Sequence, residues 1–151
     1  MMCHSLDITV SYPQARMAKC ARCPYGADHD CYRGVVMLEE PVEYYENGKT
    51  VTVKAGFCFD GASIPQAVWS MIGHPMTPKF IPAALLHDAL YASHAMPRDE
   101  ADAIFRDLLN QSGVGYLKRA AMARAVQAFG RFAWGRTPEQ LEHFARFVEI
   151  K

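Results

Sequence analysis

The pattern of apolar and polar positions changes near residue 60, from strict alternation to helical spacing. Alternation of apolar and polar residues predicts strands. The predicted strands are Leu6–Tyr12, Gly34–Leu38, Val42–Tyr45 and Val51–Phe59, and the apolar face of the last one includes Ala55. Because Asn-Gly between two strand-like runs is a strong hairpin signal, we expect a tight turn within residues 46–49.

Beyond residue 60, apolar positions recur about every 3.6 residues, as in amphipathic helices. Capping residues and prolines that open helices, and glycines that end them, divide this part of the chain. The predicted helices are Gln66–Met71 (capped by Ser63), Thr77 to about Ser93, Pro97 to Asn110, Gly115–Trp134, and Thr137 to the C-terminus. Strands followed by helices predict an α+β fold, with N-terminal antiparallel β hairpins or a small sheet followed by a bundle of about four to five helices.

A chain of 151 residues that is half hydrophobic is expected to form a single domain around one core. We divide it into residues 1–33 (a strand and a Cys-rich knuckle), 34–60 (a β hairpin region) and 61–151 (a helical region). Its 16 basic and 16 acidic side chains cancel, so no overall field attracts nucleic acid. The longest mostly apolar stretch, Phe80–Ala92, is too short to span a bilayer, so we expect no transmembrane segment.

Two adjacent polar residues, His87 and Asp88, interrupt the apolar helix predicted over Ile81–Ala92. A helix that is apolar on nearly every face is buried, and a buried carboxylate is costly unless it is paired or bound to a metal. Antiparallel packing against the next helix would place Asp102 opposite His87, and Tyr91 lies about one turn after His87. These four side chains are candidate catalytic residues.

The chemistry that this cluster suggests is general-base catalysis by His87, oriented by a carboxylate, with a calcium or zinc ion near Asp88. Asp60 is a further candidate, because its turn precedes the helices and would add a carboxylate. Turn and capping hydrogen bonds are the alternative role of Asp60. For the whole cluster, the alternative is a buried polar network that fixes how the helices pack.

Four of the five cysteines lie in the first 31 residues. The C-x2-C pair Cys20 and Cys23, with Cys31 and Cys3, supplies four thiolates, enough for a zinc ion or an iron–sulfur cluster. Such a closed four-ligand site would be structural, because it leaves no open position. The alternative is a group of free thiols.

A basic face is expected on the helix predicted over Gly115–Trp134 and just beyond it. Its basic residues are Lys118, Arg119, Arg124, Arg131 and Arg136. Such a face could bind phosphate, lipid headgroups or an acidic protein. The alternative is a solvated face whose charges are balanced by acidic residues on the preceding helix.

Four segments together resemble the domain-of-unknown-function 1353 family. They are FDGASIP (59–65), HDALY (87–91), PRDEADAIF (97–105) and FGRFAW (129–134). The resemblance covers roughly Gly34–Trp134 and implies a bacteriophage or prophage context. The N-terminus lacks a basic start followed by an apolar run, so we expect synthesis in the cytoplasm of a bacterial host. The phage context adds the virion as a location and phage structural proteins as partners, and hydrolase chemistry would add a cell-envelope substrate.

The segment HDALY also resembles the HD-x-C-Y segment of phospholipases A2. This resemblance implies that His87 activates water, that Asp88 binds calcium and that Asp102 orients the histidine. The sequence departs from that pattern at Leu90, and it has neither the flanking disulfide cysteines nor a recognisable glycine-rich calcium loop.

Two functions follow as hypotheses. The first is a phage-associated, metal-assisted His-Asp hydrolase that acts on a lipid or peptidoglycan bond of the cell envelope. The second is a non-catalytic virion, tail or assembly component with a structural metal at the cysteines. Accessibility separates them, because a catalytic His87 must face a cleft, whereas a packing histidine can be sealed.

Overall fold

A computed structural model of the chain describes residues 10–11, 36–46, 48–59, 73 and 79–151. Among the described residues, every strand except the last precedes the helices, which confirms the predicted α+β fold. The cysteine-rich segment and the helix predicted over Gln66–Met71 lie outside the described residues, as does most of the strand predicted over Leu6–Tyr12.

Strands of the described residues form two antiparallel three-stranded sheets. One sheet has the order β1 (Val10–Ser11), β2 (Val36–Leu38), β5 (Cys58–Phe59). The other has the order β3 (Val42–Glu46), β4 (Lys49–Val53), β6 (Val148–Ile150).

The hairpin between β3 and β4 is confirmed. Glu46 pairs with Lys49, which leaves a two-residue turn. Gly48 adopts a φ of 78°, in the left-handed region that hairpin turns of this length require and that glycine tolerates without strain.

The single strand predicted over Val51–Phe59 is wrong, because the chain turns in its middle. Gly56 has a φ of 90°, and its N–H donates to the carbonyl of Leu38 rather than continuing a β4 ladder. β4 and β5 therefore belong to different sheets. Ala55, predicted on the shared apolar face, is exposed in this turn.

Four helices follow among the described residues: α2 (Ile81–Ser93), α3 (Arg98–Gln111), α4 (Tyr116–Trp134) and α5 (Pro138–Ala145). The predictions for α3 and α4 are confirmed to within about one residue at each end. α2 begins later than predicted, with a proline in its first turn, where the missing N–H costs no helical hydrogen bond. None of the helices in this part of the chain is long and apolar enough to cross a membrane.

The last predicted helix is also too long. α5 begins at the predicted place, where Thr137 and Gln140 form a reciprocal capping box. It ends at Ala145, and β6 then pairs with β4. The alternating Val148 and Ile150 pack against the core, so strand pairing replaces the last helical turns.

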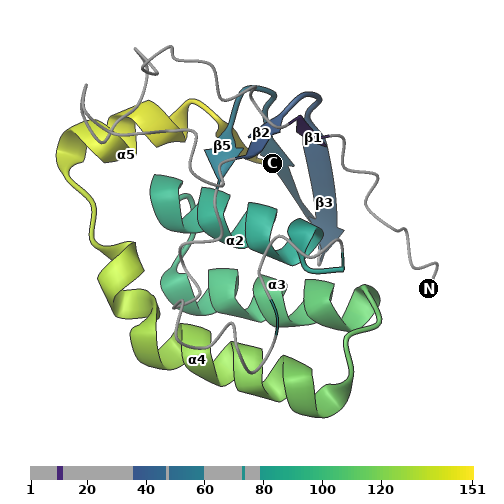
Figure 1. Ribbon diagram of the computed structural model, residues 1–151. Helices are drawn as coiled ribbons and strands as arrows, with labels where there is room; N and C mark the ends of the chain where they lie inside the picture. The colour runs from purple at the N-terminus through teal and green to yellow at the C-terminus, as the bar shows by residue number, and fades with distance from the viewer. Residues whose placement is uncertain (1–9, 12–35, 47, 60–72, 74–78) are drawn as a thin grey trace.

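The elements are stacked, with the sheets at one end, α2 beneath them, α3 next and α4 at the far side (Figure 1). α2 packs against both α3 and α5, and α3 packs against α4. One buried apolar cluster runs from the β3–β4 hairpin through α2 and α3 to α4. The Tyr44 hydroxyl donates to the Asp107 carboxylate over 2.6 Å, which ties β3 to α3.

Candidate buried His-Asp-Tyr site

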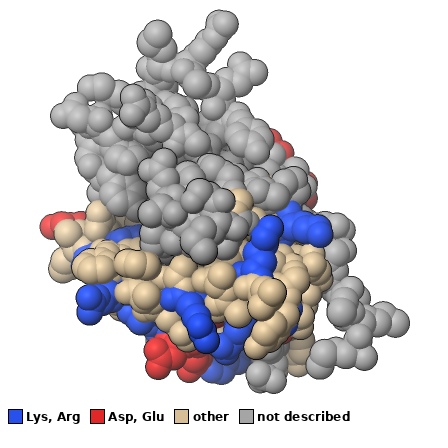
Figure 2. Space-filling model, turned by 60° about the horizontal axis from the view of Figure 1, so that its bottom comes forward, with Lys and Arg blue, Asp and Glu red and all other residues tan. Residues whose placement is uncertain are grey.

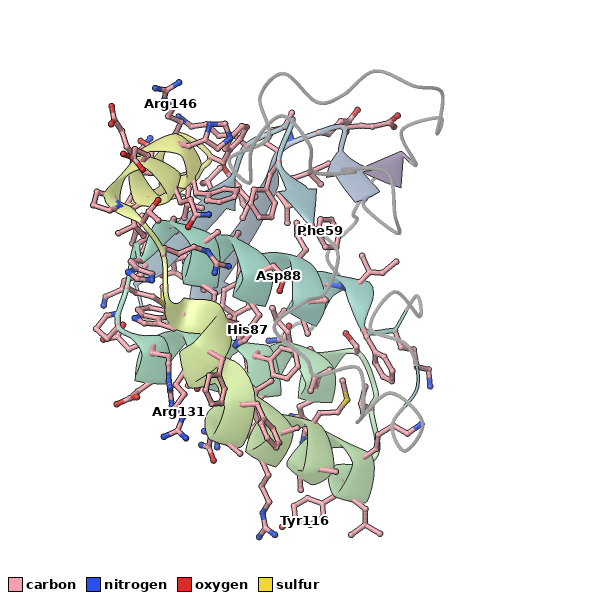
Figure 3. The ribbon with its side chains drawn as sticks, turned by 60° about the vertical axis from the view of Figure 1, so that its left-hand side comes forward. Phe59, His87, Asp88, Tyr116, Arg131 and Arg146 are labelled. Carbon is pink, nitrogen blue, oxygen red and sulfur yellow. The ribbon has the colours of Figure 1, made fainter. Side chains whose placement is uncertain are left out.

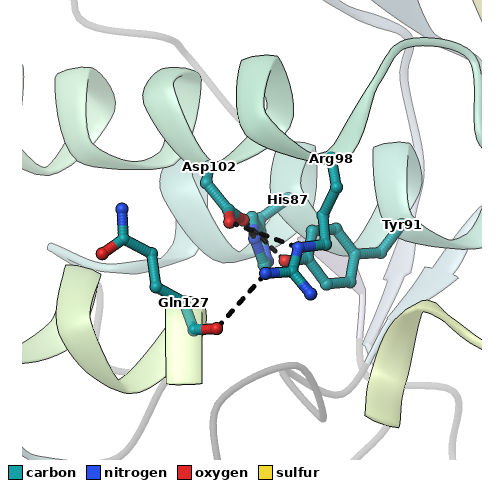
Figure 4. Close-up of polar contacts among 5 residues, drawn as sticks. All are labelled: His87, Tyr91, Arg98, Asp102 and Gln127. Atoms are coloured by element: carbon teal, nitrogen blue, oxygen red, sulfur yellow. Dashed lines mark hydrogen bonds and ion pairs between the residues drawn. The ribbon is translucent and has the colours of Figure 1, made fainter. Parts of the chain in front are cut away.

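Three polar side chains meet between α2 and α3. His94, with a φ of 52°, ends α2, and the short connector lets α3 run back along it. His87 Nε2 lies 2.8 Å from Asp102 Oδ1, and the Tyr91 hydroxyl donates to the same oxygen over 2.6 Å (Figure 4). The predicted grouping of His87, Tyr91 and Asp102 is therefore confirmed as a set of contacts.

Burial, hydrogen bonds and the nearby charge of Arg98 together set the protonation states of these groups. His87 is 0% exposed, and this desolvation lowers its pKa, against the opposing pull of Asp102. Burial also raises the pKa of the Tyr91 hydroxyl, with a further contribution from its hydrogen bond to Asp102. Burial by itself would raise the pKa of Asp102, but the hydrogen bonds from His87 and Tyr91 and the charge of Arg98 outweigh it and lower that pKa.

The tautomer of His87 follows from these states. An ionised Asp102 only accepts hydrogen bonds, so Nε2 of the neutral imidazole carries the proton and donates it. Nδ1 then holds the free lone pair. It is buried and has no hydrogen-bond partner among the residues that the structure describes. Such an atom is rare in native proteins, because it has lost its water without replacement.

One pocket lies against the outer side of this cluster, between α3 and α4. It has a volume of about 250 Å³ and is lined by Arg98, Asp99, Asp102, Ala103, Arg106, Ala123 and Gln127. Arg98 Nε is 3.9 Å from Asp102 Oδ2, and Arg98 also donates to the Gln127 carbonyl over 3.3 Å. The side chain of Asp102 keeps only 9% exposure. The pocket therefore reaches the carboxylate, whereas His87 behind it is sealed.

Asp88 takes no part in the hydrogen bonds that join His87, Tyr91 and Asp102. Consecutive helical residues point about 100° apart, so it faces another direction from His87. In Figure 3, Asp88 lies toward Phe59 and the strands, and His87 lies toward α4. Asp88 is half-buried.

The other candidate residues lie outside the part of the chain that the structure describes. They are Asp60, Cys3, Cys20, Cys23 and Cys31. Within the described ranges, no group of three or more His, Cys, Asp or Glu side chains comes close enough to hold a metal ion.

Three further residues shape the site and were missed from the sequence. Arg98 precedes Asp102 by one helical turn, a spacing that signals a pair. Phe105 places its ring 4.8 Å from the His87 ring and helps to bury it. Gly130 of α4 faces Tyr91, and a β-carbon built there would lie 2.5 Å from the tyrosine oxygen. A glycine inside a helix is the sequence signal for such a close approach.

The fold and site thus define an α+β protein with a carboxylate-bound histidine buried between two antiparallel helices. Residues 36–126 match the family described as a protein of unknown function, DUF1353. This match covers more than half of the chain, and the chain belongs to that family.

Two proteins of Sinorhizobium fredii (strain NBRC 101917 / NGR234) are similar to part of the chain. The uncharacterized protein y4jT is 33% identical over 84 residues, which cover 56% of this chain and 25% of y4jT. The uncharacterized protein y4iH is 36% identical over 76 residues, which cover 50% of this chain and 31% of y4iH. The chain therefore corresponds to a third or less of each relative. No solved structure matches the chain significantly.

Proposed function

We propose that the chain is a hydrolase in which His87 is the general base and Asp102 its orienting carboxylate. The observation that supports this proposal is the state of the imidazole. Its Nε2 is held by Asp102 at 2.8 Å, and its Nδ1 is buried without a partner among the described residues. A neutral imidazole with a fixed tautomer and an unused lone pair is prepared to accept a proton.

In the proposed reaction, Nδ1 takes a proton from water while the water oxygen attacks a carbonyl carbon. The Asp102 carboxylate stabilises the imidazolium that forms. Tyr91 donates a hydrogen bond to this carboxylate, and Arg98 forms an ion pair with it. Collapse of the tetrahedral intermediate breaks the bond to the leaving alcohol or amine, and the imidazolium returns its proton to that group. Because His87 is 0% exposed, turnover requires an opening that admits water and substrate to Nδ1.

The substrate class and the cation belong to the same proposal. A lipid ester or peptidoglycan bond of a bacterial envelope suits a phage-associated role, which the family resemblance implies. A calcium or zinc ion near Asp88 would polarise the carbonyl, but its other ligands would have to come from outside the described residues. No step above depends on that ion.

The test is hydrolysis by the purified chain, with calcium, with zinc or with a chelator. The substrates are phospholipid vesicles, followed by fatty-acid release, and purified peptidoglycan, followed by soluble-fragment release. We expect His87→Gln to lower the rate at least about 100-fold, because general-base catalysis contributes about 10²- to 10⁴-fold. His143→Gln, on α5 and partly exposed, is the matched control and should retain the rate.

An additional readout separates a base from a packing residue. The base must be neutral, so kcat/KM should fall as pH drops through the His87 pKa, which lies below 6.5. A folded His87→Gln variant that keeps wild-type turnover would overturn the proposal.

The complete burial of His87 favours a second candidate, a non-catalytic virion, tail or assembly component. In it, the His-Asp-Tyr cluster sets helix packing, and the cysteines hold a structural zinc ion or iron–sulfur cluster. This candidate predicts no turnover of either substrate. It also predicts zinc or iron in the purified protein that is lost in a Cys20→Ser/Cys23→Ser variant.

A further inference from the structure

All charged side chains of α4 are basic. Its 19 residues include four basic side chains, Lys118, Arg119, Arg124 and Arg131, and no aspartate or glutamate. The chain as a whole has a formal net charge of zero, so this helix concentrates positive charge that the remainder balances. Figure 2 brings this side of the molecule forward and shows Lys and Arg side chains among uncharged residues, with Asp and Glu side chains toward the edges of the view.

Several exposed side chains lie on one side of α4, around Ala121, which is partly buried and packs against the core. The outward face, as we call it, consists of Leu117, Arg124, Ala128, Arg131 and Phe132, whose spacing places them within about 100° of one another around the axis. All five residues are exposed.

The core-facing side of α4 is distinct from this face. It carries the buried Met122, Val126 and Gly130. In Figure 3, Arg131 points away from the rest of the molecule. The outward face is therefore not required for packing within the described fold.

Two large apolar side chains project from this face. Leu117 is 83% exposed and Phe132 is 70% exposed, near opposite ends of a helix in which they are separated by about 22 Å of rise. The Arg131 guanidinium lies 4.9 Å from the centre of the Phe132 ring, so charge and apolar surface are presented together. Phe129, at 48% exposed, adds apolar surface at the flank.

We propose that the outward face of α4 docks onto an anionic lipid surface. Basic side chains attract anionic headgroups, and leucine and phenylalanine enter the boundary between headgroups and acyl chains. On this face, apolar and basic side chains alternate along the helix. A protein–protein interface typically has instead a compact apolar centre surrounded by a polar rim. Docking would bring the chain to the lipid substrate of the proposed hydrolase. Only this biological role rests on the proposed function, because binding itself requires no hydrolysis.

The test is flotation of the full chain with vesicles of phosphatidylcholine alone and of phosphatidylcholine with phosphatidylglycerol. We expect binding to the anionic vesicles only, and weakening at high salt. Each arginine near an anionic surface contributes about fivefold to binding, so Arg124→Gln/Arg131→Gln should weaken it about 30-fold. Leu117→Ser/Phe132→Ser should weaken it as well.

Matched controls lie on other elements. Lys54→Gln/Arg146→Gln removes two exposed charges, and Tyr45→Ser removes an aromatic side chain that is 72% exposed on β3. Both controls should bind like the wild type. Equal losses in the controls and in the α4 variants would overturn the proposal. So would equal binding to both kinds of vesicle, or binding to neither.

Self-association of the chain, measured by sedimentation and abolished by Leu117→Ser/Phe132→Ser without any vesicle binding, would assign the face to a second copy instead. Binding requires no turnover, so His87→Gln should float with anionic vesicles like the wild type. A chain that binds vesicles but hydrolyses nothing would overturn the proposed function and leave the docking surface intact. Lipid hydrolysis that does not depend on the outward face would overturn the docking surface and leave the proposed function intact.

Discussion

Asp102 accepts two hydrogen bonds on a single oxygen, from an imidazole and from a phenol. Protonation of the carboxyl would leave both donors with a weaker, neutral acceptor, because a charged acceptor makes each hydrogen bond stronger. The ionised carboxylate is thus the centre of the cluster. His87 remains neutral because it is buried more completely than Asp102.

Acid should destabilise the protein through His87. The unfolded histidine titrates near 6.5 and the folded one lower, so below about pH 6.5 the unfolded chain binds more protons. The free energy of unfolding should therefore fall as pH drops from 7 toward 5. The fall should be shallower in His87→Gln, as measured by urea denaturation at each pH.

His143 also contributes to the pH dependence of the free energy of unfolding, and its contribution must be measured separately. Partial burial and, to a lesser extent, the charge of Arg146 lower the pKa of this histidine. The variant His143→Gln gives this second contribution. A wild-type slope that persists unchanged in His87→Gln would contradict the assigned shift.

Removing the hydroxyl of Tyr91 should destabilise the fold. The Tyr91→Phe variant keeps the buried ring but deprives Asp102 of one donor. Hydrogen bonds to charged groups contribute about 1.5–3 kcal/mol, so we expect a loss of about 2 kcal/mol in urea denaturation. Tyr116→Phe, on the exposed start of α4, should change stability by less than about 0.5 kcal/mol. Equal effects of the two substitutions would argue against the bond.

At the scale of elements, Gly130 explains how α4 approaches α2. Alanine is preferred over glycine inside a helix by about 1 kcal/mol, yet a β-carbon at this position would meet the Tyr91 hydroxyl at 2.5 Å. Gly130→Ala should therefore destabilise the wild type. In the Tyr91→Phe background the added methyl meets only ring carbons, at 3.2 Å, so the cost should be smaller.

A double-mutant cycle from thermal or urea denaturation measures this coupling. Ala128→Gly, on the exposed side of the same helix, is the matched control for helix propensity and should show no coupling to Tyr91→Phe. Additive effects of Gly130→Ala and Tyr91→Phe would contradict the contact.

Helix pairing was predictable from the sequence because it depends on local spacing. The short connector after α2 fixes an antiparallel hairpin, and counting residues from that turn places His87 opposite Asp102. The break at Gly56 was not predictable from the sequence. Apolar and polar residues continue to alternate through the turn, and β2, the strand that pairs with β5, is distant in sequence. β6 was missed for the same reason: its pairing with β4 is non-local.

For the whole molecule, the C-terminal strand joins the end of the chain to the first half. Val148 and Ile150 are partly buried, so removing residues 148–151 should lower the free energy of unfolding by about 2 kcal/mol. Glu149→Ala, which changes only an exposed side chain of β6, should shift it by less than about 0.5 kcal/mol. A truncated chain as stable as the wild type in urea would contradict the packing of β6.

The candidate site was predictable in part. Polar residues in an apolar helix revealed His87, and helical spacing added Tyr91. The sealing of the imidazole by Phe105 and the pocket beside Asp102 depend on how helices distant in sequence pack, which no single-helix pattern contains. The roles of Asp60 and the cysteine cluster remain predictions from the sequence.

We expect His87 to be a neutral base, with its proton on Nε2 and with Nδ1 unprotonated. Nitrogen-15 NMR of histidine-labelled protein, titrated from pH 8 to pH 5 and assigned with His87→Gln, measures both the tautomer and the pKa. We predict the Nε2–H tautomer at pH 7 and a midpoint of protonation below pH 6.5. A proton on Nδ1 at pH 7, or an imidazolium at that pH, would contradict it.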